Sequence, residues 1–160
     1  MKKIRLLPFI IAVLIPLLVG IVSAMISSKG MAMYGTMSKP PLSPPAWVFP
    51  VAWTILYIMM GVASYFVFVS DADSKLKMMA LLIYIIQLAM NFMWSIVFFN
   101  WKLYLVAFVW LIVMWGLVII CAFRFYGINK AAGYMMIPYI VWLTFAAYLN
   151  LGTYIIKLVE

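Results

Sequence analysis

The sequence predicts an all-α membrane protein, a bundle of five transmembrane helices. Of its 160 residues, 70% are apolar and 9% are charged, whereas soluble domains are about 45–50% apolar and about 25% charged. The mean hydropathy is +1.22, and a soluble globule of about 150 residues would still expose roughly a third of its chain surface. These values exclude a water-soluble domain and a disordered chain.

Five long uncharged stretches define the expected helices, because about 20 apolar residues cross the hydrocarbon core of a bilayer. They are residues 6–28, 46–69, 78–101, 103–123 and 131–156. The alternating segments that are typical of membrane β-strands are absent from the sequence. Without a repeat or a second composition class, the chain is expected to form one domain over residues 1–160.

The first stretch begins after basic residues, as a secretory signal peptide does. Its uncharged run over residues 6–28 is longer than the 7–15 apolar residues of a signal peptide. We therefore expect a retained helix. The stretch also carries Gly20, Ala24 and Ser28 at four-residue spacing, a pattern that permits close packing of helices in membranes.

The longest predicted connection, residues 29–45, is rich in proline: Pro40, Pro41, Pro44 and Pro45. Proline fixes φ and removes a backbone donor, so this segment is expected to be stiff and extended. Long loops in compact proteins often close over binding sites. The alternative, a plain connector, stays open at this point.

Polar and aromatic side chains gather on one face of the second, third and fifth stretches when each is placed at 100° per residue. The candidate faces contain Trp53 and Tyr57; Gln87, Asn91 and Trp94; and Trp142, Phe145 and Ala146. Amide side chains are costly against lipid, so Gln87 and Asn91 are expected to point inward. The first and fourth stretches show weaker polar faces and are predicted to contact lipid or partner helices.

The deep tryptophans have two interpretations. Trp94 and Trp142 lie too far inside their stretches for the aromatic belt at the membrane interface. Ordinary packing between helices is one explanation, and a cavity for a flat, largely apolar ring compound is the other. In the second case, Tyr34, Gln87 and Asn91 are candidates to hydrogen-bond the polar rim of the ligand.

Charge is placed at the ends of the apolar stretches. Eleven Lys and Arg against three Asp and Glu give a net charge of +8, but the basic residues are scattered, so we expect no nucleic-acid partner. With five spans, seven basic residues fall on the side of the N-terminus and four on the other side. The positive-inside rule then predicts a cytoplasmic N-terminus.

The sequence lacks the side chains that several kinds of chemistry require. The chain has no histidine, one cysteine, Cys121, and no charged residue inside an apolar stretch. We therefore expect no metal site, no resident cofactor, no hydrolytic activity and no ion-coupled transport. The expected partners are the lipid bilayer and a small apolar ring ligand.

Three motifs resemble the translocator protein family, also called tryptophan-rich sensory proteins or peripheral benzodiazepine receptors. They begin at Pro44-Pro45-x-Trp47-x-Phe49-Pro50-x-x-Trp53, at Gln87-Leu88-Ala89-x-Asn91-x-x-Trp94 and at Pro138-Tyr139-x-x-Trp142-x-Thr144-Phe145-Ala146. The resemblance covers all five stretches. It implies a bacterial member of the family in the cell membrane, with five helices around a cavity that the first loop closes.

The resemblance further implies binding of porphyrins such as protoporphyrin IX, of sterols and of benzodiazepine-site drugs. The family's ligand contacts fall on Tyr34, Pro44, Trp53, Tyr57, Asn91, Trp94, Trp142, Phe145 and Ala146. It also leaves a homodimer open. The leading functional interpretation is a receptor or sensor. Light- and oxygen-dependent porphyrin degradation, with Trp53 and Trp142 as participants, and transport of porphyrin or lipid are the alternatives.

Overall fold

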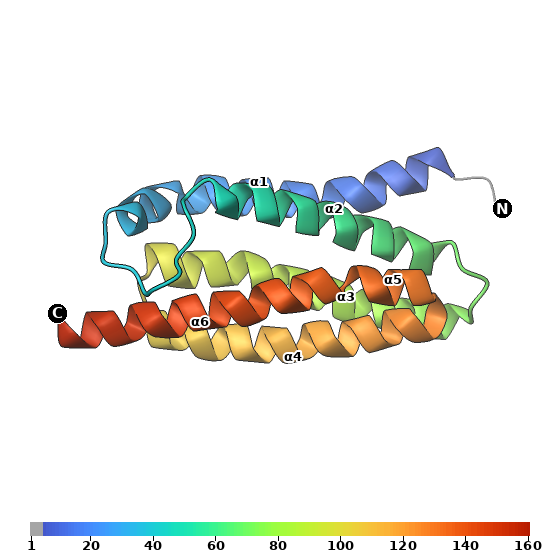
Figure 1. Cartoon of the computed structure of the whole chain (residues 1–160). Helices are drawn as coiled ribbons and strands as arrows, with labels where there is room; N and C mark the ends of the chain where they lie inside the picture. The colour runs from blue at the N-terminus through green and yellow to red at the C-terminus, as the bar shows by residue number, and fades with distance from the viewer. Residues whose placement is uncertain (1–4) are drawn as a thin grey trace.

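The computed structural model describes residues 5–160 and arranges them as an elongated bundle of helices (Figure 1). The elements are α1 (Leu6–Gly35), α2 (Val48–Phe68), α3 (Ser74–Ser95), the π-helical turn η1 (Ile96–Asn100), α4 (Tyr104–Ile128), α5 (Lys130–Met135) and α6 (Ile137–Val159). With η1 extending α3 and α5 leading into α6, five helical segments of the described chain are long and apolar enough to cross a membrane. The predicted fold class, an all-α bundle of five spans, is confirmed.

The first helix extends beyond its predicted end at residue 28 and stops at Gly35. A single lysine, Lys29, does not end it, because the last turns are held by packing. The ring of Tyr34 contacts those of Phe98 and Phe99 at centroid distances of 5.4 and 5.7 Å. The connection to α2 is therefore shorter than the predicted loop of residues 29–45 and covers residues 36–47.

Two irregular turns lie at the C-terminal end of α3 and just before α6. In η1 the amide of Trp101 donates to the carbonyl of Ile96 at 3.0 Å, which is the wider spacing of a π-turn. This turn brings the consecutive residues Phe98 and Phe99 against α1. The break between α5 and α6 lies at Met136, just before Pro138, whose ring cannot supply a helical N–H.

The fourth helix has two faces. Val106, Val109 and Val113 are exposed, which fits the predicted contact with lipid. One face of α4 is fully buried, at residues spaced by three or four: Ala107, Leu111, Met114, Val118, Cys121 and Phe125. This face packs on α3 and α6. We call these six residues the α4 seam. Hydropathy alone missed the seam because lipid tails and buried neighbours are equally apolar.

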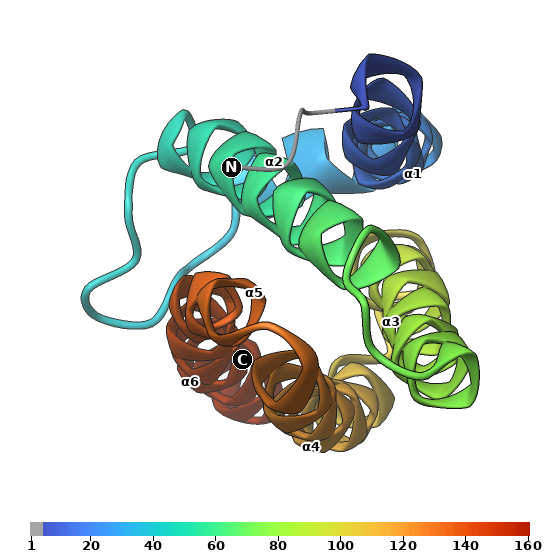
Figure 2. The ribbon, with the colours of Figure 1, turned by 90° about the vertical axis from the view of Figure 1, so that its right-hand side faces the viewer.

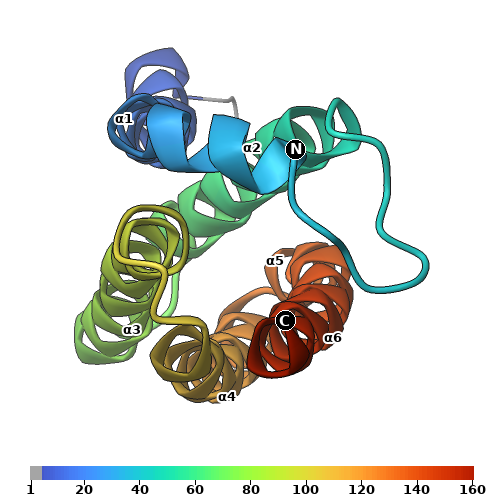
Figure 3. The ribbon, with the colours of Figure 1, turned by 90° about the vertical axis from the view of Figure 1, so that its left-hand side faces the viewer.

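The views along the bundle show α1 lying outside α2, on the far side of the molecule from α4 (Figures 2 and 3). Figure 1 shows that the α2–α3 connection and the start of α5 share one end of the bundle with the start of α1. The α1–α2 loop and the C-terminus lie at the other end. The candidate site lies toward the end with the α1–α2 loop and the C-terminus.

Candidate functional site

A cavity of about 350 Å³ lies between α1, α2, the α3–η1 junction and α6, next to the α1–α2 loop. Eight aromatic side chains line it: Tyr34, Phe49, Trp53, Tyr57, Trp94, Phe98, Phe99 and Trp142. Its volume falls in the range of about 300–1,000 Å³ that is typical of small-molecule sites, which are mostly apolar with a few polar groups. The cavity therefore has the size and lining of a ligand site.

The aromatic lining of α2 and α6 forms one connected group. Trp53 stacks on Tyr57, one helical turn further along, with centroids 5.4 Å apart and an interplanar angle of 27°. Trp142 of α6 meets Trp53 edge-to-face at 6.4 Å and Phe49 at 6.1 Å. These are the preferred geometries of aromatic pairs, and they fix the indole planes before any ligand enters.

A second connected group comes from α1, the end of α3 and η1. Trp94 stacks on Phe98 at 5.2 Å and 24°, and Phe98 and Phe99 both contact Tyr34. Since Tyr34 belongs to the last turn of α1, the extension of that helix past residue 28 is what brings its ring to the site. Each group supplies aromatic faces or edges to the same cavity.

Behind Tyr57, a buried hydrogen-bond network joins α2, α3 and α6. The Tyr57 hydroxyl donates to Asn91 Oδ1 at 2.8 Å, and Asn91 Nδ2 donates to the Tyr139 hydroxyl at 3.0 Å. Tyr139 in turn donates to Gln87 Oε1 at 3.0 Å. Buried polar groups need such partners. The network therefore satisfies both amides inside the protein, and it positions Tyr57 at the base of the cavity.

This network changes the role expected for Gln87 and Asn91. Both are buried, as the cost of an amide in lipid predicts, but neither is among the residues that line the cavity. Their side chains hold Tyr57 and Tyr139 instead of reaching the position of a ligand's rim. Asn91 thus contacts Tyr57, which lines the cavity, but does not line the cavity itself.

A second polar pair was missed by the sequence reasoning. The indole Nε1 of Trp94 donates to Asn150 Oδ1 at 3.2 Å, and Asn150 Nδ2 donates to the carbonyl of Tyr104 at 2.8 Å. Both Trp94 and Asn150 line the cavity. The signal was present, because Asn150 is an amide inside an apolar stretch and falls under the argument applied to Asn91.

The Trp142 indole N–H differs from that of Trp94. Its Nε1 atom is buried and has no hydrogen-bond acceptor within residues 5–160. The ring lines the cavity beside Trp53 and Phe49. A buried donor without a partner carries a desolvation cost of about 1–3 kcal/mol, and an acceptor supplied from the cavity would remove that cost.

The structure brings six of the ten predicted contact residues to the cavity surface: Tyr34, Trp53, Tyr57, Trp94, Trp142 and Ala146. Besides the two amides, Pro44 and Phe145 lie outside the lining. Phe145 packs behind Trp142 at a centroid distance of 5.9 Å. From the loop, Lys39 and Ala46 border the cavity instead of Pro44.

The small residues of α1 also have a different use from the one considered for them. A Cβ on Gly20 would lie 2.2 Å from Cε2 of Tyr57, so the glycine allows α1 to approach the aromatic lining. Gly20 and Ala24 both border the cavity. Gly20 thus packs within the chain, whereas Ser28 is exposed and does not line the cavity, and the homodimer stays a prediction without an interface.

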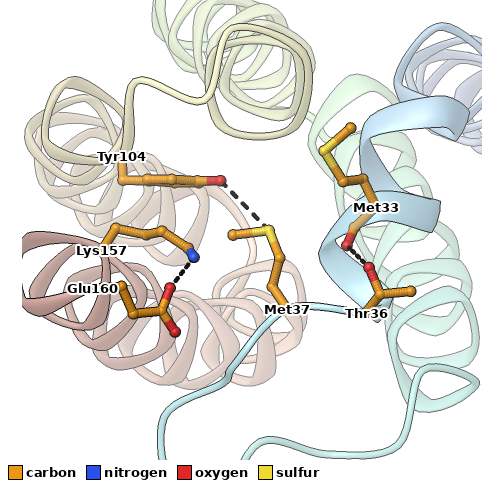
Figure 4. Close-up of polar contacts among 6 residues, drawn as sticks. All are labelled: Met33, Thr36, Met37, Tyr104, Lys157 and Glu160. Carbon is orange, nitrogen blue, oxygen red and sulfur yellow. Dashed lines mark hydrogen bonds and ion pairs between the residues drawn. The ribbon is translucent and has the colours of Figure 1, made fainter.

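The α1–α2 loop is attached to α4 and α6 at several points. Tyr148 donates its hydroxyl proton to the carbonyl of Pro41 at 2.7 Å, and Pro40 is buried against Gly152. Nearer α1, the Tyr104 hydroxyl lies 3.8 Å from the sulfur of Met37, next to the ion pair of Lys157 and Glu160 (Figure 4). These contacts hold the loop beside the cavity.

Comparison with known proteins places the chain among membrane proteins of one family. Residues 12–155 match the TspO/MBR family. The chain is 35% identical over 117 residues to tryptophan-rich protein TspO of Chlorobaculum tepidum, covering 73% of this chain and 74% of that protein. It is 38% identical to a tryptophan-rich sensory protein of Cereibacter sphaeroides, with 73% and 72% covered. With the translocator protein of Sus scrofa it shares 33% identity, with 90% and 86% covered.

Proposed function

The chain belongs to the TspO/MBR family of multi-pass membrane proteins, and we propose that it is a receptor for a flat, largely apolar ring compound of the porphyrin type. The ligand would occupy the cavity between α1, α2, η1 and α6. The observation that carries the proposal is the aromatic lining, eight rings around about 350 Å³. Aromatic pairs contribute about 0.5–1.5 kcal/mol each beyond area burial, so several stacked contacts would supply most of the affinity.

Two polar groups support a ligand with acceptors on its edge. The buried Nε1–H of Trp142 has no acceptor among the described residues and would donate to a ring substituent. Lys39 borders the cavity from the loop, with its ammonium 5.7 Å from the ring centre of Tyr34. Its positive charge would pair with a carboxylate at the rim, as protoporphyrin IX carries. A purely apolar ring would use neither group.

The proposal is tested by titrating the purified protein with protoporphyrin IX and following the quenching of tryptophan fluorescence. Trp142→Phe keeps a ring but removes the donor, so affinity should fall about two- to tenfold. Trp142→Ala removes the stacking face as well and should weaken binding further. Trp101→Phe is the matched control, because Trp101 is exposed and outside the cavity. Saturable quenching that is unchanged in Trp142→Ala would contradict this site.

A second measurement separates the role of Lys39 from that of the rings. Lys39→Gln should lower the affinity for protoporphyrin IX but leave the affinity for its dimethyl ester unchanged, because the ester has no carboxylate to pair with the ammonium. Equal affinity losses for the acid and the ester would contradict a charge-pairing role and would leave the aromatic contacts as the source of affinity.

One observation favours a second activity at the same site, light- and oxygen-dependent degradation of the porphyrin. The indoles of Trp53 and Trp142 lie together at 6.4 Å and both line the cavity. An excited porphyrin there would take an electron from an adjacent indole, with dioxygen as the final oxidant. A product spectrum that forms in light and air, and that is absent in the dark and in Trp53→Phe, would support this activity. Binding without conversion would exclude it.

A further inference from the structure

A second hollow lies on the outer surface of the bundle, away from the aromatic cavity. It is a groove of about 450 Å³ between the end of α2 and the first half of α3. Phe68 forms one wall, and the other is a row of α3 side chains that includes Met78, Leu82 and Ile85. The groove lies at the end of the bundle that carries the α2–α3 connection, whereas the aromatic cavity borders the α1–α2 loop at the other end (Figure 1).

The α3 wall of the groove faces away from the protein. Met78, Leu82 and Ile85 are exposed, and they lie opposite the face that buries Tyr84 and Gln87. The apolar part of the wall runs from Met78 to Ile85, which at 1.5 Å per residue is about 10 Å. One leaflet contributes about half of a hydrocarbon core of roughly 30 Å. The apolar wall thus covers about two-thirds of the depth of one leaflet's acyl region.

The polar end of the groove is formed by Lys77. Its Nζ donates to the carbonyl of Ser70 at 3.0 Å, so the ammonium is held at the mouth of the groove. An ammonium has three N–H donors, and this bond uses one of them. The neighbouring carboxylate of Asp73 is occupied as the helix cap, accepting from the amides of Lys75 and Leu76 at 2.9 and 3.3 Å.

The same end of the bundle carries more basic than acidic side chains. Besides Lys77 it carries Arg5, Lys75, Arg124 and Lys130, at the ends of α1, α3, α4 and α5, against Asp71 and Asp73 in the α2–α3 connection (Figure 1). It is also the side that the distribution of basic residues predicts to be cytoplasmic. The cytoplasmic leaflet is the one with anionic lipids, and basic pockets between transmembrane helices on that side attract their head groups.

We propose that this groove binds an anionic phospholipid of that leaflet. The phosphate pairs with the free N–H groups of Lys77, and one acyl chain lies along Met78, Leu82 and Ile85 against Phe68. The argument rests on charge complementarity at one end and on a continuous apolar wall along the rest. It is independent of the receptor proposal, because the groove and the aromatic cavity share no lining residue.

The test is native mass spectrometry of the full chain in mild detergent with added phosphatidylglycerol or phosphatidylcholine of identical acyl chains. Phosphatidylglycerol should occupy the first site more tightly. One basic side chain near an anionic head group raises the lipid affinity by a factor of about five. Lys77→Gln should therefore lower the affinity for phosphatidylglycerol about fivefold and leave the affinity for phosphatidylcholine unchanged. Lys77→Arg should retain the preference, which separates loss of charge from loss of folding.

Two further variants distinguish the alternatives. Lys130→Gln removes a charge from the same end of the bundle but outside the groove, and it should change the affinity less than twofold. Leu82→Ser should lower the affinity for both lipids, because it removes an apolar side chain from the wall. Free glycerol 3-phosphate should not bind, since the acyl chain is required. Equal losses in Lys77→Gln and Lys130→Gln would mean general surface attraction and would overturn the proposal. So would a dimer signal that Leu82→Ser abolishes, because a second copy would then cover the groove.

Discussion

The helices α4 and α1 lie on opposite sides of the bundle, and they are held there in different ways. The α4 seam is apolar and fully buried over most of the helix length. In α1, the buried residues are Pro16, Ser23 and Ser27, and its closest approaches to neighbours occur at glycines. Large side chains thus fill the space beside α4, whereas small residues bring α1 close to α2 and leave the aromatic cavity open beside it.

This difference indicates where the protein can tolerate a change of volume. The α4 side is packed solidly, so any lost atom there creates a new void. The α1 side already borders a cavity of about 350 Å³, so lost atoms there enlarge existing space. The contrast can be tested by equal substitutions on the two sides.

The largest expected effect is that of Leu111→Ala in the α4 seam. Leucine-to-alanine changes at buried sites cost about 2–5 kcal/mol, and the cost grows with the void that remains. Leu149→Ala is the matched variant, because Leu149 is also buried but lines the cavity. We expect a smaller loss there. Unfolding by increasing denaturing detergent gives both free energies, and equal losses would contradict the division of the bundle into a solid and a hollow side.

The next effect concerns the glycine contacts of α1. A Cβ on Gly61 would lie 2.6 Å from Cα of Val13 and 2.7 Å from the carbonyl oxygen of Ala12. Since these are backbone atoms, α1 and α2 must separate, and overpacking of this kind costs about 1–3 kcal/mol. Gly61→Ala should therefore lower stability in the same detergent titration.

Gly116→Ala provides the control for that prediction. Nothing lies within 4 Å of a Cβ added at Gly116 in α4, and alanine is the better helix former by about 1 kcal/mol. This variant should be neutral or stabilising. If Gly61→Ala behaved in the same way, the close approach of α1 to α2 would not be a determinant of stability.

The comparison also explains what the sequence could and could not predict. The five spans follow from hydropathy and charge, because the hydrocarbon thickness sets the helix length. The inward faces of α2, α3 and α6 follow from residues such as Asn91 and Trp142, whose polar groups are costly against lipid. The α4 seam carries no such mark, since Leu111 and Met114 suit lipid and protein equally.

Details within the site needed coordinates for a related reason. Periodicity places Asn91 and Trp94 on one face, but it does not say that Asn91 is used by Tyr57 and Tyr139. That depends on side chains of three helices meeting at hydrogen-bond distance. Likewise, the extension of α1 to Gly35 depends on Tyr34 reaching Phe98 and Phe99, a contact between residues more than sixty positions apart.

A smaller effect is expected in the loop on the hollow side. Leu42 has a φ of 64°, in the left-handed region that disfavours side chains by about 1–2 kcal/mol and that asparagine tolerates better. Its side chain is exposed, so Leu42→Asn should stabilise the loop by up to about 1 kcal/mol. Leu42→Val should destabilise it, because branched side chains fit this region worst. Limited proteolysis within residues 36–47 reports the order of the loop, and identical rates for the two variants would contradict the role of backbone strain.

The smallest effect concerns the attachment of the same loop to the C-terminus. The ammonium of Lys157, and then the hydroxyl of Ser38, hold the pKa of the Glu160 carboxyl below its ordinary value. A group with a lowered pKa stabilises the folded form when it is ionised. The contribution is therefore complete above the ordinary pKa and is lost as the pH falls through the lowered one.

Amide hydrogen exchange in residues 36–47 can detect this contribution, if wild type and Glu160→Gln are compared at each pH so that the intrinsic rates cancel. At neutral pH the wild-type loop should exchange slightly more slowly than the variant, and the difference should shrink as the pH falls through the lowered pKa of Glu160. The other two acidic side chains, Asp71 and Asp73, lie at the opposite end of the bundle. A difference that persisted at low pH would show that neutral hydrogen bonds, and not the carboxylate charge, attach the loop to α6.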